Sequence, residues 1–115
     1  MDEAIRIGDK VHIVTRRRFH DDVRRHFVGV VEAVSGAASR VHGYTFVHNE
    51  GSGEFEKRPT PRVRIFGLAG GLQIVNVLPP TFDVSTARYE VRDGRLVVTD
   101  GSEYALDLNE LSVRA

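Results

Sequence analysis

Arginines and aromatic side chains are the residues of this chain most suited to binding chemistry. Three arginines are consecutive, two more follow a short acidic stretch, and aromatic side chains lie near them in the sequence. Guanidinium groups bind phosphate oxygens through paired hydrogen bonds, and aromatic rings stack on nucleic-acid bases. The sequence therefore indicates a candidate nucleic-acid or partner surface, which comprises Arg16, Arg17, Arg18, Phe19, Arg24, Arg25, Arg40, Tyr44 and Phe46.

Two other interpretations of these arginines remain open at this stage. They could lie in a solvated loop whose charge is partly neutralised by Asp21 and Asp22, or contact the acidic C-terminal part of a neighbouring copy. Residues 1–64 carry 12 Lys/Arg and 9 Asp/Glu, whereas residues 65–115 carry 4 and 7. The net charge of the whole chain is zero, which disfavours non-specific nucleic-acid binding because that requires a large positive excess.

The histidines do not form a metal-ligand pattern. His42 and His48 would share one face of a strand, but the rise along a strand would separate them by about 20 Å. The only local cluster of possible ligands comprises His20, Asp21, Asp22 and His26. It lacks the i, i+4 pair of a helical zinc site. We therefore expect surface or structural histidines, and no metal or other cofactor.

No catalytic group stands out either. Glu32 lies in the most apolar segment, where burial would raise its pKa and make it a proton donor. It alternates with Val31 and Ala33, however, and we expect it to face solvent. The glycine-rich residues 67–71 lack the Lys-Ser/Thr pair of a phosphate-binding loop. No serine has a matched histidine and acid, so we expect no enzymatic activity.

Five segments have the composition and alternation of β-strands: residues 10–17, 26–34, 40–48, 62–68 and 72–78. The first is expected to bury one face. Gly29 and Gly43 interrupt the second and third, and such glycines are typical of strong curvature. Residues 54–61 are predicted to be a polar connector, and residues 18–25 either one helical turn or a loop. We interpret residues 1–80 as a small β-barrel, ended by Pro79-Pro80.

Residues 81–115 are predicted to form a second unit packed on the first. Asp93-Gly94 favours a type I′ turn between strands at 87–92 and 95–99. A further strand is expected at 103–107 and a short helical turn at 108–112. The predicted fold class is therefore all-β: a highly curved five-stranded barrel followed by a β-meander.

The barrel segment resembles the small SH3-like and Sm-like class over residues 9–80. Gly29-x-Val31-x-x-Val34 is similar to the first motif of the Sm-like family, and Gly71-x-x-Ile74-x-x-Val77-x-Pro79 is similar to its second motif. The resemblance implies a small, strongly bent barrel. The family's RNA-contacting aspartate and asparagine would fall near Ser35 and Ser39, and the arginine before its second-motif glycine is Gly70 here. The resemblance therefore extends to the fold and not to the RNA-contacting residues.

Tyr44 and Phe46 share one face of their strand, and Val41, Thr45 and Val47 occupy the other. Both faces thus carry apolar side chains. We expect the C-terminal meander to cover one of them, and the alternative is contact with a partner or another copy. Open sheets also have edges that can pair with another chain. We predict a non-enzymatic interaction or assembly module that forms homo-oligomers or binds a protein partner; the alternative is RNA binding through the arginine and aromatic surface.

Location is predicted from composition. The chain has no cysteine, no run of about 18 apolar residues and no apolar stretch near Met1. We therefore expect a soluble, cytoplasmic protein without a signal peptide or membrane contact.

Overall fold

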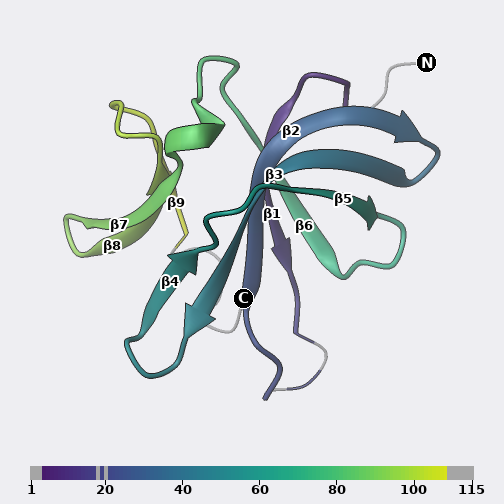
Figure 1. Ribbon diagram of the computed structural model, residues 1–115. Helices are drawn as coiled ribbons and strands as arrows, with labels where there is room; N and C mark the ends of the chain where they lie inside the picture. Colours follow the sequence, from purple (N-terminus) through teal and green to yellow (C-terminus); the bar gives the residue numbers. More distant parts are fainter. Residues whose placement is uncertain (1–3, 18, 20, 109–115) are drawn as a thin grey trace.

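The computed structural model describes residues 4–17, 19 and 21–108, and in this part of the chain the fold is all-β, as predicted. The strands are β1 (Lys10–Thr15), β2 (Arg25–Ser35), β3 (Ala38–Asn49), β4 (Glu54–Lys57), β5 (Arg62–Gly67), β6 (Gln73–Leu78), β7 (Arg88–Arg92), β8 (Arg95–Thr99) and β9 (Ala105–Asp107). The only helix among the described residues is a single 3-10 turn, η1 (Val84–Thr86). Figure 1 shows two sheets, with β7, β8 and β9 to one side of the others.

The first sheet has the order β4-β3-β2-β1-β6, with β5 also paired to β3, and every pairing is antiparallel. All five strands predicted for this part are present. β4 was expected to be connector, and that prediction was wrong. β4 and β5 pair with opposite ends of β3 and behave as one strand interrupted at 58–61. Pro59 and Pro61 explain the interruption because proline has no N–H to donate.

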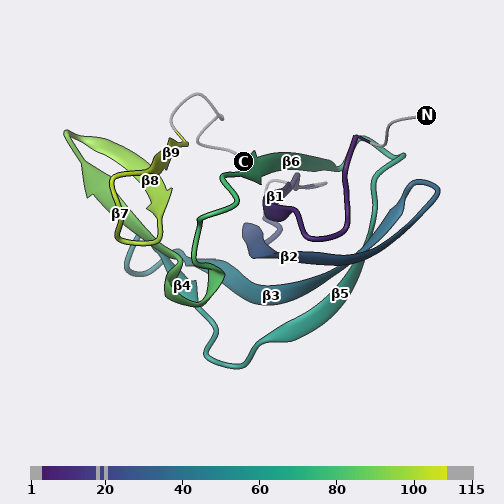
Figure 2. The ribbon, with the colours of Figure 1, turned by 90° about the horizontal axis from the view of Figure 1, so that it is seen from above.

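The two predicted bending glycines lie directly opposite each other, Gly29 on β2 and Gly43 on β3. A Cβ on Gly43 would lie 2.0 Å from the Val28 carbonyl oxygen, and one on Gly29 would lie 2.5 Å from that of His42. Only glycine permits this close approach of the two backbones. Figure 2 shows the result, a sheet in which β2, β3 and β5 curve beneath β1 and β6.

Curvature brings side chains from every strand of this sheet except β4 into one cluster on its inner face. Val11, Ile13, Phe27, Val31 and Val41 are buried there, and Phe66 of β5 and Val75 of β6 pack against them. Among the described residues β5 and β6 do not pair with each other. The sheet is therefore open along this seam.

The outer face of the first sheet carries a second core. Val28, Phe46 and Leu78 pack there against Phe82, Ala87 and Val98 from the C-terminal part. Tyr44 also packs against this cluster, so the cover predicted for Tyr44 and Phe46 comes from the same chain. β1 is buried on both faces, including His12 and Val14. The prediction of a single buried face for this strand was wrong because β1 lies between the two cores.

The second sheet has the order β7-β8-β9. Asp93 and Gly94 have φ values of 52° and 78°, the left-handed conformation that a type I′ turn requires. The helical turn predicted at 108–112 lies outside the described residues, apart from Leu108. No described helix has the length and apolar character needed to cross a membrane.

Candidate functional site

A groove of about 480 Å³ opens on the inner face of the first sheet, beside the interruption between β4 and β5. We call it the arginine groove. Its lining residues are Val23, Arg25, Thr45, Val47, Arg58, Pro59, Thr60, Arg62 and Arg64.

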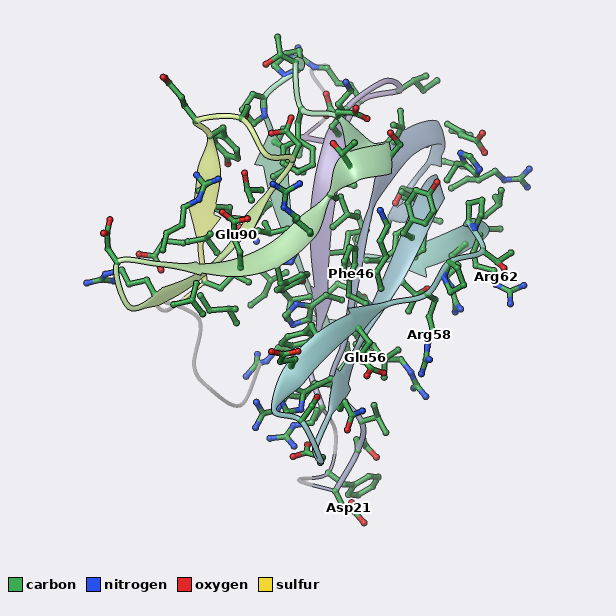
Figure 3. The ribbon with its side chains drawn as sticks, turned by 60° about the vertical axis from the view of Figure 1, so that its left-hand side comes forward. Asp21, Phe46, Glu56, Arg58, Arg62 and Glu90 are labelled. Carbon is green, nitrogen blue, oxygen red and sulfur yellow. The ribbon has the colours of Figure 1, made fainter. Side chains whose placement is uncertain are left out.

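Strand register explains why the arginines gather there. Arg25 is opposite Val47, and Arg64 is opposite Val41. Residues directly opposite each other in antiparallel strands project from the same face, so both arginines point to the inner face. Arg62, two residues from Arg64, shares that direction. Figure 3 shows Arg58 and Arg62 close together along this flank, with Glu56 nearby on β4.

The four arginines of the groove lack ion pairs among the described residues, although Glu56 lies opposite the lining residue Val47. Arg25, Arg58, Arg62 and Arg64 have no ion pair and no side-chain hydrogen bond within the part of the chain that the structure describes. Glu56, the nearby acid, instead accepts a hydrogen bond of 3.0 Å from the Asn49 amide. Arginines without partners can form charge-assisted hydrogen bonds with an incoming anion.

One buried hydroxyl group also lines the groove. Thr45 is 8% exposed, and its Oγ1 has no hydrogen-bond partner among the described residues. A buried hydroxyl group without a partner costs free energy. The groove therefore combines four positive charges with an unused donor and acceptor.

Several arginines predicted from sequence do lie together. Thr15 is opposite Arg25, so Arg16 and Arg17 leave β1 at the end where Arg24 and Arg25 approach β2. Arg40 lies near the other end of β3, opposite Ile65. Arg18 lies outside the described residues.

The predicted aromatic residues do not lie on this surface together. Phe19 is 67% exposed in the loop before β2, but Phe46 is 1% exposed on the outer face of the sheet. Tyr44 projects from the same outer face and packs on the second core. The buried ring of Phe46 therefore lies beneath the C-terminal sheet, whereas the ring of Tyr44 is only partly covered.

Sequence reasoning missed Arg58, Arg62 and Arg64 as site residues. The alternation Arg62-Val63-Arg64 shows that two arginines share a face, but not which face that is. The register with β3 supplies this information, and a single sequence does not specify it.

A second polar cluster joins the two sheets. The Tyr89 hydroxyl group on β7 lies 2.8 Å from Nε2 of His12 and 2.5 Å from Nδ1 of His26. The Asn76 amide nitrogen on β6 lies 3.2 Å from Nδ1 of His12. Phe55 of β4 stacks on both His26 and Tyr89, with ring centroids 4.4 and 4.8 Å apart.

The direction of these hydrogen bonds follows from the Asn76 amide. Its N–H donates to Nδ1 of His12, so His12 carries its proton on Nε2 and donates to Tyr89. The Tyr89 hydroxyl group then donates to Nδ1 of His26, which leaves the proton of His26 on Nε2. That atom is buried and has no partner among the described residues.

Both histidines of this cluster are neutral near pH 7. Burial, and then the neighbouring His26, lower the pKa of His12 to about 3. Burial, followed by Arg24 and His48, lowers the pKa of His26 to about 4. Burial raises the pKa of Tyr89. The cluster is an uncharged hydrogen-bonded link between the sheets, which agrees with the structural role predicted for the histidines.

The sequence offers Glu32 as a candidate proton donor and His20, Asp21, Asp22 and His26 as a candidate ligand cluster, and it favours neither. Glu32 is exposed, as expected, at an irregularity in the pairing of β2 with β3. His20 lies outside the described residues, and His26 is buried at Tyr89. Within the described ranges no three His, Asp or Glu side chains are grouped in a way that could hold a metal ion.

Comparison with known proteins gives no relative. No family model matches the chain, and no curated protein or solved structure matches it.

Proposed function

We propose that this chain is a non-enzymatic, cytoplasmic interaction module that self-associates through the edges of its first sheet. One observation supports this best: among the described residues β5 pairs only with β3, and β6 pairs only with β1. The outer edge of each strand presents unpaired N–H and C=O groups, which can pair with a strand of another chain. The absence of cysteine suits a reducing compartment.

Exposed apolar side chains on both edges support the same proposal. Val63 and Ile65 on β5 are 54% and 65% exposed, and Val77 on β6 is 57% exposed. β6 has no charged residue and no proline. Edge strands of monomeric proteins are usually protected by such residues, so an unprotected edge favours occupation by another chain.

The two edges are different, and this determines the type of assembly. If β5 of one copy pairs with β6 of the next, the contact is heterologous and repeats until a ring closes or a filament forms. We infer that residues 9–80 belong to the SH3-like or Sm-like barrel class and that the neighbouring copy covers the open seam. The strand order and the opposed Gly29 and Gly43 support this inference.

Sedimentation velocity over a range of concentrations tests the proposal. The unmodified chain should sediment as an oligomer of more than two copies. Val77→Lys should shift it to monomer, because a charge on β6 opposes pairing. The control is Val91→Lys, at a valine of the second sheet that is 70% exposed, and it should leave the oligomer intact. A monomer at the highest concentration would refute self-association.

A second candidate function is RNA binding. The pairing of Thr15 with Arg25 favours it. This pairing brings four arginines to one end of the sheet: Arg16, Arg17, Arg24 and Arg25. Fluorescence anisotropy with labelled single-stranded RNA over a range of salt concentrations tests it. Binding should weaken as salt increases and should weaken further in the Arg24→Ala/Arg25→Ala variant. RNA binding without a salt dependence would contradict this candidate.

A further inference from the structure

We propose that the arginine groove is a binding site for phosphate groups. This inference concerns the inner face of the sheet and does not depend on edge pairing. The ligand chemistry is a tetrahedral oxyanion carried by a free phosphate, a pyrophosphate or a phosphodiester.

The first argument is the uncompensated charge. Four arginines, from β2, β5 and the 58–61 connection, line one groove of about 480 Å³, and none has an acidic partner among the described residues. Like charges held close together raise the free energy of the folded state. A bound anion removes this repulsion and forms hydrogen bonds to the same groups.

The second argument is the unused hydroxyl group of Thr45. Its Oγ1 is buried in the lining and has no partner among the described residues. Oγ1 is closed to solvent in the structure, so the Thr45 side chain must rotate to donate to a phosphate oxygen whose neighbours face the arginines. The hydroxyl group and the arginines together thus match a ligand with several acceptor oxygens.

The lining also argues against recognition of a nucleobase. Val23, Val47 and Pro59 are its non-polar residues, and no aromatic side chain lines it. Stacking of bases on aromatic rings is the usual source of affinity for single-stranded nucleic acids. The groove therefore recognises the phosphate group itself.

Isothermal titration calorimetry at low salt tests the proposal, with inorganic phosphate, pyrophosphate, a single-stranded oligonucleotide and polyglutamate as separate probes. Pyrophosphate should bind more tightly than phosphate, because it contacts more arginines. If the oligonucleotide binds more tightly than pyrophosphate, the phosphate group belongs to a phosphodiester. If pyrophosphate binds more tightly, the ligand is a small molecule. Polyglutamate binding as tightly as either would overturn the assignment to phosphate and indicate an acidic peptide.

Matched variants locate the site. Arg62→Gln/Arg64→Gln should weaken pyrophosphate binding at least about tenfold, since each lost charge-assisted bond is worth that much. Arg40→Gln, at an exposed arginine of β3 outside the groove, should change it less than twofold. Thr45→Val keeps the shape of the side chain and should weaken binding about threefold to tenfold. Circular dichroism confirms that each variant is folded. No measurable binding by the unmodified chain, or equal binding by the groove and control variants, would overturn the proposal.

Discussion

The Tyr89 hydroxyl group lies 2.8 Å from Nε2 of His12 and joins β7 of the second sheet to β1 of the first. Its other bond is to His26, so two imidazoles of the first sheet depend on one side chain of the second. Each polar group left buried without a partner at such a junction costs free energy. The stability of the contact between the sheets should therefore depend on this hydroxyl group.

Tyr89→Phe should destabilise the protein by about 1–3 kcal/mol, because it leaves ring nitrogens of His12 and His26 buried without a partner. Urea unfolding followed by circular dichroism measures the change. Tyr104→Phe is the matched control, since Tyr104 is partly buried on the same core and no hydrogen bond of its hydroxyl group contributes to this junction. An equal loss in both variants would show that the Tyr89 bonds contribute little.

Stability should fall as the pH decreases from 7 to 5. The pKa values of His12 and His26 are lowered in the folded state to about 3 and 4, below the ordinary value of about 6.5. The unfolded chain thus binds more protons in this range, and stability is lost as the pH falls from about 6.5 toward these values. The loss should be on the order of 1–2 kcal/mol per histidine between pH 7 and pH 5.

Urea unfolding at pH 7, 6 and 5 measures this dependence. Carboxylates with lowered pKa values, such as Asp100 at about 2, contribute only at lower pH and do not obscure it. A free energy of unfolding that is unchanged between pH 7 and pH 5 would contradict neutral burial of the two histidines.

The sequence predicted the strands of the first sheet and its bending points well. Alternation and turn residues are local signals, and Gly29 and Gly43 mark places where a side chain does not fit. β4 was missed because its four residues lie between Gly53 and Pro59, where local signals indicate a loop. Its pairing comes from β3, which extends past Phe46 and supplies a partner.

The burial of His12 and the assembly of the arginine groove could not be predicted in the same way. Which face of β1 is covered depends on where Phe82 and Tyr89 pack, and periodicity within residues 10–17 does not contain that information. The arginine groove likewise depends on pairs such as Arg64 with Val41. The sequence indicated Arg25, which lines the groove, but also Arg40, which projects from the opposite face of β3 to Val41.

Phe55→Ala should lower the free energy of unfolding by about 2–4 kcal/mol. This is somewhat less than the loss expected for a fully buried phenylalanine, because Phe55 is partly exposed. The ring stacks on His26 and Tyr89, so its loss opens a cavity beside the polar cluster. Phe19→Ala removes the same group from a position that is 67% exposed and should cost less than about 0.5 kcal/mol. Thermal and urea unfolding of the two variants gives the comparison, and similar values for both would mean that β4 does not support the cluster.

Gly43→Ala should be among the most destabilising single-methyl changes in this protein. The added Cβ would lie 2.0 Å from the Val28 carbonyl oxygen and 2.5 Å from the Cα of Gly29. Both are backbone atoms, so β2 and β3 must separate. The free energy of unfolding should therefore fall by about 3 kcal/mol or more. Gly67→Ala on β5 is the control, because a Cβ there meets no atom within 4 Å, and it should be neutral or slightly stabilising through a less flexible unfolded chain. If urea unfolding gave the same stability for both variants, the opposed glycines would not be what permits the bend of the first sheet.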